Sequence, residues 1–247
     1  MLLFIFVFGL LIGSFLNVCI YRIPSGQSIA FPPSSCPQCG KRLTWYELIP
    51  VLSYVMQCGR CRKCSTSISI IYPLVELLTG ILFVSSYLRY GYTVEFLTAA
   101  ILVSIMIVAA FIDITHKIIP NKLVLFGLAV GIPLGLFRFD AGPIFILAGF
   151  AAGFIPMFLI AVISGGQMGF GDVKLAGVMG VFLGWKGVLV AILLAFFAGA
   201  VYGLFLMIVL GRGRKTAVPF GPFLAFSSVI CYLWLDTIIS WYFSIIL

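Results

Sequence analysis

The sequence predicts an all-α polytopic membrane protein with about eight transmembrane helices and a small cytoplasmic zinc-binding loop domain between the first two. Of its 247 residues, 63% are hydrophobic and 9% are charged. Soluble domains have about 25% charged residues, so most of the surface of this chain must face lipid. Its apolar runs approach the roughly 20 residues that a helix needs to cross a bilayer. One polar segment, between the first two runs, holds five of the seven cysteines.

The apolar runs give the predicted spans, which are residues 2–20, 70–88, 94–112, 122–138, 143–164, 173–185, 187–210 and 219–244. The run 173–185 is short, and a re-entrant hairpin arm is the alternative for it. The net charge of +8 comes from short basic clusters between the runs. This pattern indicates the positive-inside rule and argues against a nucleic-acid partner. It places the N-terminus outside.

The polar segment divides the chain into three predicted parts. Residues 21–69 hold six of the fifteen basic residues, and a segment of about fifty residues cannot bury much apolar core. We therefore expect a first transmembrane helix at 1–20, a cytoplasmic cysteine-rich domain at 21–69 and a transmembrane core at 70–247.

The cysteines of this domain have the spacing of a metal site. Cys36-Pro-Gln-Cys39 is one C-x-x-C pair, and Cys58-Gly-Arg-Cys61-Arg-Lys-Cys64 contains a second. Two such pairs are typical of tetrahedral zinc, and a structural metal supplies stability that a small core cannot. Disulfides are disfavoured in the reducing cytoplasm. Cys61 can pair with Cys64 or with Cys58, and the spacing alone leaves this open.

Asp113 and Asp172 differ from the other acidic residues because each adjoins a long apolar run. Ionisable groups at membrane depth are costly unless they are paired or hydrated, so they mark functional sites. On the predicted topology both lie at the cytoplasmic ends of helices, where two carboxyl groups that share a proton can act as acid and base. Alternatively, His116 or Lys117 pairs with Asp113 and Lys174 pairs with Asp172. A proton-coupled transporter would use similar carboxylates.

Motifs along nearly the whole chain resemble those of the type IV prepilin peptidase family and follow the order of that family. They are Gly13-Ser-Phe-Leu-Asn-Val18 with Tyr21-Arg-Ile-Pro24, Cys36-Pro-Gln-Cys39, Gly59-Arg-Cys61-Arg-Lys-Cys64, Tyr72-Pro-Leu-Val-Glu76, Phe111-Ile-Asp113 with Ile119-Pro-Asn121, Gly169-Phe-Gly-Asp-Val-Lys174 and Pro219-Phe-Gly-Pro222. Gly-x-Gly-Asp alone would be a weak signal, whereas the ordered set is specific.

The resemblance implies an aspartyl endopeptidase of the GxGD type in the bacterial inner membrane, with Asp113 and Asp172 as its catalytic pair at the cytoplasmic side. Its substrates would be type IV prepilins or pseudopilins, which carry a short basic leader before a hydrophobic helix. Proteolysis of this kind needs no cofactor. Family members with a cysteine-bearing loop usually also methylate the new N-terminus with S-adenosylmethionine, so we expect that second activity here.

The resemblance also implies roles for further residues. It favours Cys36, Cys39, Cys61 and Cys64 as the zinc ligands and leaves Cys58 as a spare ligand or a free thiol. The glycines of the Gly-x-Gly-Asp motif would let an extended peptide approach the carboxylate closely, because they lack a Cβ. The residues expected to contact the substrate are Gly169, Gly171, Lys174, Glu76, Pro219 and Gly221. Glu76 would bind the amine of the substrate or the methyl donor, or else pair with a loop arginine.

Overall fold

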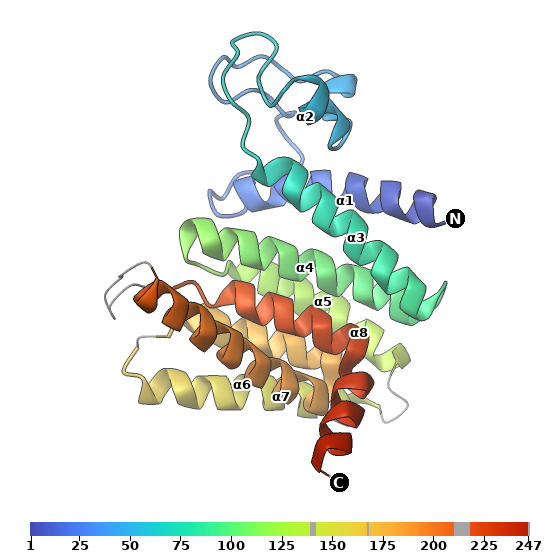
Figure 1. Ribbon diagram of the computed structural model, residues 1–247, viewed down its shortest axis with the longest axis vertical. Helices are drawn as coiled ribbons and strands as arrows, with labels where there is room; N and C mark the ends of the chain where they lie inside the picture. Colours follow the sequence, from blue (N-terminus) through green and yellow to red (C-terminus); the bar gives the residue numbers. More distant parts are fainter. Residues whose placement is uncertain (139–141, 167, 210–217, 247) are drawn as a thin grey trace. The chain divides into compact units, whose positions relative to one another are not determined.

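The computed structural model describes residues 1–138, 142–166, 168–209 and 218–246, and these residues are helical or irregular. The chain divides into two units, Met1–Gly91 and Tyr92–Leu247. Helices α1 to α8 follow one another along the chain (Figure 1). We describe each unit by itself.

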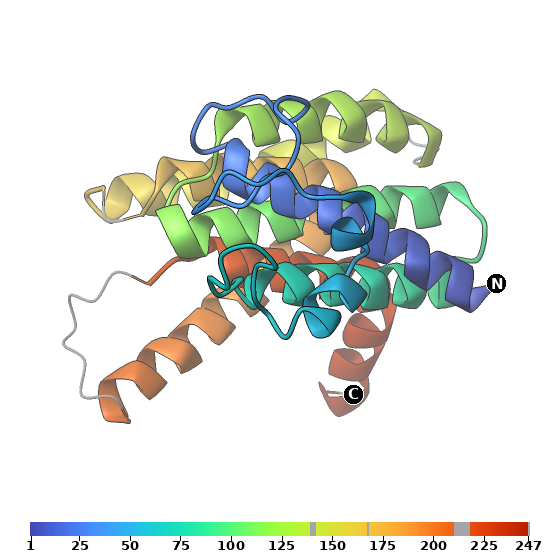
Figure 2. The same cartoon turned by 90° about the horizontal axis from the view of Figure 1, so that it is seen from above.

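The first unit contains two long helices and the cysteine-bearing segment that joins them. The helices α1 (Leu2–Arg22) and α3 (Ile71–Tyr90) pack against each other (Figure 2). Their backbones come close because glycines face each other: a Cβ on Gly9 would lie 2.7 Å from the Cα of Gly80. Glycine at such a crossing lets two apolar helices approach without a side chain between them.

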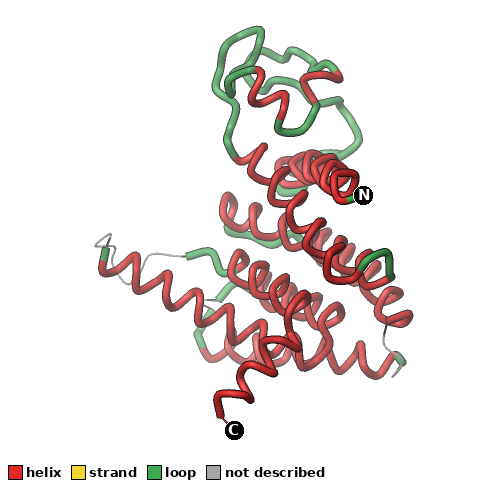
Figure 3. The backbone as a smooth tube through the Cα atoms, turned by 45° about the vertical axis from the view of Figure 1, so that its right-hand side comes forward, coloured by secondary structure: helices red, strands yellow, loops and turns green. Residues whose placement is uncertain are grey.

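The segment between α1 and α3 contains only short helices, η1 (Trp45–Leu48) and α2 (Leu52–Met56). Figure 3 shows that most of it is loop. We call residues 23–70 the cysteine lobe. Inside it, η1 begins with a capping box, in which Thr44 and Glu47 exchange hydrogen bonds. Such a box satisfies backbone donors that the first turn of a helix leaves free.

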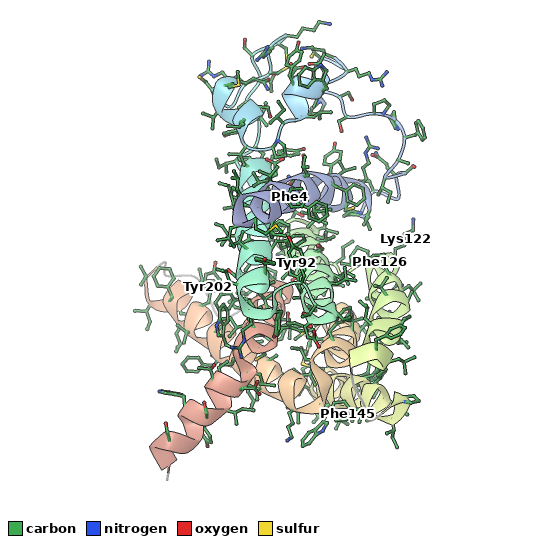
Figure 4. The ribbon with its side chains drawn as sticks, turned by 90° about the vertical axis from the view of Figure 1, so that its right-hand side faces the viewer. Phe4, Tyr92, Lys122, Phe126, Phe145 and Tyr202 are labelled. Atoms are coloured by element: carbon green, nitrogen blue, oxygen red, sulfur yellow. The ribbon has the colours of Figure 1, made fainter. Side chains whose placement is uncertain are left out.

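The second unit is a bundle of five helices. They are α4 (Val94–His116), α5 (Asn121–Arg138), α6 (Pro143–Ile163), α7 (Phe170–Ile208) and α8 (Gly221–Ile246). The pairs that pack most extensively are α6 with α7, α7 with α8 and α4 with α8. Apolar side chains such as that of Phe126 on α5 point away from the bundle (Figure 4), where lipid would surround them.

Six helices of the described residues are long and apolar enough to cross a membrane, which confirms the polytopic prediction. They are Leu2–Arg22, Ile71–Tyr90, Val94–His116, Pro143–Ile163, Phe170–Ile208 and Gly221–Tyr242, with a shorter apolar helix at Asn121–Phe137. The predicted span 173–185 and residues 187–208 of the next one fall within α7, whose 39 residues are interrupted at Gly184 (φ 71°, ψ 174°). A helix of that length would be about 58 Å long if straight. The total of eight spans stays a prediction.

Candidate active site and metal centre

Asp113 lies in the last turn of α4, and its side chain is buried with 6% of the residue exposed. The helix ends at Lys117, which adopts the left-handed conformation and donates its N–H to the carbonyl of Asp113. The backbone N–H of Gly221, at the start of α8, donates to Asp113 Oδ2 at 2.8 Å. A Cβ on Gly221 would lie 2.8 Å from the same oxygen. Only glycine therefore fits at position 221 without displacing the carboxylate.

Asp172 is the third residue of α7 and is 8% exposed. Gly169 is the N-cap of α7 and has an extended backbone. Its carbonyl accepts a hydrogen bond from the backbone N–H of Asp172. A Cβ on Gly169 would lie 3.3 Å from Asp172 Oδ2. The first turn of a helix favours a negative charge, such as that of an ionised Asp172. Because Gly169 has no side chain, the space beside this carboxylate stays free.

The structure brings Asp113 and Asp172 together within the second unit, near enough for their charges to interact. Neither forms an ion pair with a lysine, arginine or histidine in the described ranges. The alternative pairing of Lys174 with Asp172 is not observed, because Lys174 Nζ donates to Asn121 Oδ1 at 2.9 Å. Two close carboxyl groups without a cation cannot both ionise easily, so they can share a proton.

The connection between α4 and α5 supports the turn that carries Asp172. A Cβ on Gly171 would lie 2.9 Å from the Cβ of Ile119, so the missing side chain of Gly171 makes room for Ile119. Lys174 also lies 5.3 Å from the ring centre of Phe170. The sequence does not predict this hydrogen bond between Lys174 and Asn121, although Asn121 belongs to the Ile119-Pro-Asn121 motif of the family resemblance. Pro219 lies two residues before the start of α8.

Four thiols of the cysteine lobe converge on one point. The Sγ atoms of Cys36, Cys39, Cys61 and Cys64 all lie within 4.8 Å of one another, and those of Cys36 and Cys64 are 3.8 Å apart. Zn–S bonds of about 2.3 Å in a tetrahedron give S–S distances of roughly 3.8 Å. The donor set and its size therefore fit a tetrahedral metal ion.

The two C-x-x-C pairs have the same backbone. In each, the first cysteine carbonyl accepts an N–H from four residues later, Gly40 in one and Ser65 in the other, and both of these residues have a positive φ. A β-bridge closes each turn, between Ser35 and Arg42 and between Arg60 and Ser67. These knuckles point backbone N–H groups toward sulfur, which suits thiolates that bind a cation.

The pKa values of the thiols also favour the binding of a cation by this cluster. The hydroxyl and the backbone of Thr66 lower the pKa of Cys64 to about 6. The pKa of Cys39 is raised to about 11, since burial and the neighbouring thiols outweigh the effect of the Lys41 backbone N–H. Four thiolates repel one another so strongly that a metal ion must bind before all of them lose their protons. Cys58, by contrast, is exposed and lies outside the cluster.

Glu76 lies in the first unit, on α3, with 7% of the residue exposed. Its Oε2 accepts the backbone N–H of Val51 at 2.8 Å, and no arginine in the described part of the chain forms an ion pair with it. The sequence analysis also missed Glu47, which forms an ion pair with Lys41 at 2.8 Å. That ion pair and hydrogen bonds from Thr44 lower the pKa of Glu47 to about 2. The Thr44-x-x-Glu47 pattern is typical of a capping box and could have indicated this structural role of Glu47.

Comparisons with known proteins cover most of the chain. Residues 7–90 match the bacterial peptidase A24 N-terminal domain, and residues 100–204 match the type IV leader peptidase family. A prepilin leader peptidase/N-methyltransferase of Bacillus subtilis (strain 168) is 39% identical over 246 residues, which are 98% of each chain. One of Aeromonas salmonicida (strain A449) is 34% identical, over 98% of this chain and 94% of that relative.

A relative of the same name from Myxococcus xanthus (strain DK1622) is 43% identical over 224 residues, but this chain spans only 65% of its length. No solved structure matches the chain. The matches lie in both units and include the segments that carry the four clustered cysteines, Asp113 and Asp172. The chain belongs to the type IV leader peptidase family.

Proposed function

We propose that this protein is a membrane aspartyl endopeptidase that removes the short basic leader of type IV prepilins or pseudopilins. The observation that carries this proposal is the pair of buried aspartates, one at the end of α4 and one at the start of α7, neither of which forms an ion pair among the residues that the structure describes. Membership of the leader peptidase family supports it, and the family match gives no support to a proton-coupled transporter.

The two carboxyl groups would hydrolyse the peptide bond by sharing one proton. The ionised aspartate takes a proton from water while the oxygen of that water attacks the peptide carbonyl carbon. The protonated aspartate donates its proton to the carbonyl oxygen. Collapse of the tetrahedral intermediate returns that proton, breaks the C–N bond and passes the other proton to the leaving amine. The products are a free carboxylate on the leader and a free amine on the mature pilin.

The glycines around the pair would position the substrate. The Gly221 N–H fixes Asp113 Oδ2, and Gly169 leaves the side of Asp172 open. An extended peptide can approach a backbone that lacks Cβ atoms. Lys174 and Pro219 would complete the edge of this site. On the predicted topology the site lies at the cytoplasmic face of a bacterial cell membrane, where the leader stays in water and the pilin helix lies in lipid.

The chain would also methylate the new N-terminus with S-adenosylmethionine, as the names of its relatives suggest. The reaction transfers a methyl group from the sulfonium to the amine nitrogen and releases S-adenosylhomocysteine and a proton. A cavity of about 300 Å³ in the first unit, lined by side chains of α1, Leu77 and residues 49–52, does not fit this donor, because its lining side chains are apolar and offer no partner for adenosine. We therefore assign no residue to the methyl donor, and Glu76 remains a candidate contact for the amine.

The cysteine lobe would hold one structural zinc ion through Cys36, Cys39, Cys61 and Cys64, whose thiol arrangement fits it. Bound zinc would link the two knuckles and supply the stability that the small apolar core of the lobe cannot. It would take no part in proteolysis.

Substitution of the aspartates tests the proposal directly. Asp113→Asn and Asp172→Asn should each abolish cleavage of a co-expressed prepilin, because an amide can neither accept nor relay the proton. Asp236→Asn, at an exposed position of α8, is the matched control and should retain activity. Mass spectrometry of the pilin N-terminus would report cleavage and methylation together. Cleavage by either site variant would overturn the assignment.

A further inference from the structure

The cysteine lobe exposes an apolar surface on its two short helices. Leu52, Val55 and Met56 of α2 are spaced as one helix face, and they are 61%, 63% and 72% exposed. Trp45 of η1 is 78% exposed. Apolar patches of this kind on a soluble surface mark a contact with another molecule or a membrane.

The lobe that carries this surface has a strong excess of basic side chains. Glu47 is the sole acidic residue of 23–70 in the sequence, and it is buried against Lys41. The guanidinium of Arg62 lies 5.1 Å from the ring centre of Tyr46. Apolar and aromatic side chains beside cations are typical of segments that lie in a membrane interface. The exposed basic residues of the lobe are Arg42, Arg60, Arg62 and Lys63.

The segment that carries this surface also contacts a membrane span. Residues 49–52 and Leu77 line a cavity of about 300 Å³ together with side chains of α1 between Leu3 and Leu11. That stretch of α1 belongs to a helix apolar enough to cross the bilayer. This contact holds residues 49–52 of the lobe against α1.

A hydrogen bond from the backbone N–H of Val51 to Glu76 explains how this irregular backbone can lie at the edge of a membrane. A backbone N–H without a partner costs several kcal/mol in hydrocarbon. Val51 has a positive φ of 61° and donates its N–H to the buried carboxylate of Glu76. The acid on α3 therefore positions the loop and satisfies a donor that lipid cannot satisfy.

We propose that residues 48–56 are an interfacial anchor, which inserts its apolar face among the acyl chains of the bilayer while the basic residues of the lobe bind anionic headgroups. The charge of the lobe selects anionic lipid, because each cation near such a surface raises the affinity by a factor of about five. This inference does not depend on the peptidase activity.

Fluorescence of Trp45 in reconstituted full-length protein tests the anchor. The other tryptophans, Trp185, Trp234 and Trp241, are all exposed and can be replaced by phenylalanine. In vesicles of phosphatidylcholine and phosphatidylglycerol brominated in the upper acyl chain, the fluorescence of Trp45 should be lower than in the same vesicles without bromine, because an interfacial segment lies about 5–10 Å deep. It should resist acrylamide in the water phase. Full quenching by acrylamide without quenching by the brominated lipid would overturn the proposal.

Two sets of variants separate the apolar and the basic contribution. Leu52→Glu with Met56→Glu should abolish quenching by the brominated lipid, whereas Ser53→Glu, on another side of α2, should preserve it. Neutralisation of Arg60, Arg62 and Lys63 by glutamine should remove the difference between vesicles with and without phosphatidylglycerol. Arg89→Gln, at the other end of α3, is the control. Zinc content verifies that the lobe of each variant is folded. If the brominated lipid still quenched Trp45 in the variant with both Leu52→Glu and Met56→Glu, the proposed anchor would be contradicted.

Discussion

The cysteine lobe and the α4–α8 bundle are held together by different contacts. In the lobe, the buried residues include two cysteines and Glu47, and its ordered backbone consists of two knuckles and short turns. In the bundle, α4 and α7 bury long series of apolar side chains. The lobe therefore depends on a few polar and metal contacts, whereas the bundle depends on how closely its helices approach.

This difference determines which substitutions matter in each region. A change of one ligand atom should disorder the lobe and leave the bundle intact. A single methyl group should disturb the bundle where two helix backbones touch and leave the lobe intact. Substitutions of each kind separate the two regions experimentally.

The largest effect is expected for the metal ligands. Cys61→Ser should remove the zinc, because structural zinc binds with roughly 10 kcal/mol or more of free energy that a hydroxyl ligand cannot supply. Trypsin should then cleave the lobe at its exposed basic residues. Cys58→Ser, at the exposed position outside the cluster, should retain about one zinc per chain. Metal analysis and limited proteolysis measure both. Equal zinc in the two variants would disprove this ligand assignment.

Close packing in the bundle gives the next largest effect. A Cβ on Gly180 of α7 would overlap the carbonyl of Gly149 on α6, and the backbones would have to separate. Gly180→Ala should therefore destabilise the bundle by about 3 kcal/mol. Gly203→Ala is the matched control on the same helix, because nothing lies within 4 Å of its Cβ. It should stabilise α7 by up to about 1 kcal/mol. Thermal unfolding in detergent would measure both, with unchanged zinc content.

Sequence reasoning predicted the features that depend on composition and local spacing. The six candidate spans match predicted apolar runs, and the all-helical membrane architecture is confirmed. The four clustered cysteines are those that the family resemblance favoured, whereas spacing alone could not choose between Cys58 and Cys64. The knuckle conformation makes that choice, because Cys58 lies before the turn that repeats around Cys61 and Cys64.

Contacts between distant segments could not be predicted in this way. The Gly221 N–H reaches Asp113 across 108 positions of sequence, and only the packing of α8 on α4 brings them together. Likewise, the family resemblance indicated a role for Glu76 on α3. Its partner is the backbone N–H of Val51, and no pattern of side chains reveals such a contact. Gly184 interrupts α7 through a positive φ, whereas hydropathy suggested two separate runs.

A smaller effect is expected for the ion pair in the lobe. Glu47→Gln removes the charge that Lys41 contacts and weakens the capping box, so the lobe should lose about 2 kcal/mol of stability. Because the pKa of Glu47 is lowered to about 2, its contribution is complete above the ordinary value of about 4.3 and disappears only as pH falls toward the folded value.

Retention of zinc in urea measures this difference. The gap between the wild type and Glu47→Gln should be the same at neutral pH and at about pH 6, since the carboxylate is ionised at both. Thr44→Ser, which keeps the hydroxyl of the capping box, is the control and should resemble the wild type. A gap that closed already near pH 6 would contradict the ion pair.

The smallest effect distinguishes the two knuckles from each other. Gly40 and Ser65 occupy equivalent positions with φ of 67° and 56°, a region that costs an L-residue about 1 kcal/mol. Gly40→Ala should therefore weaken zinc binding about fivefold, although nothing lies within 4 Å of its Cβ. Ser65→Gly should change it by less than about twofold, because relief of strain is offset by greater freedom of the unfolded chain. Competition with a zinc chelator measures both, and equal losses in the two variants would mean that the knuckles do not share this backbone requirement.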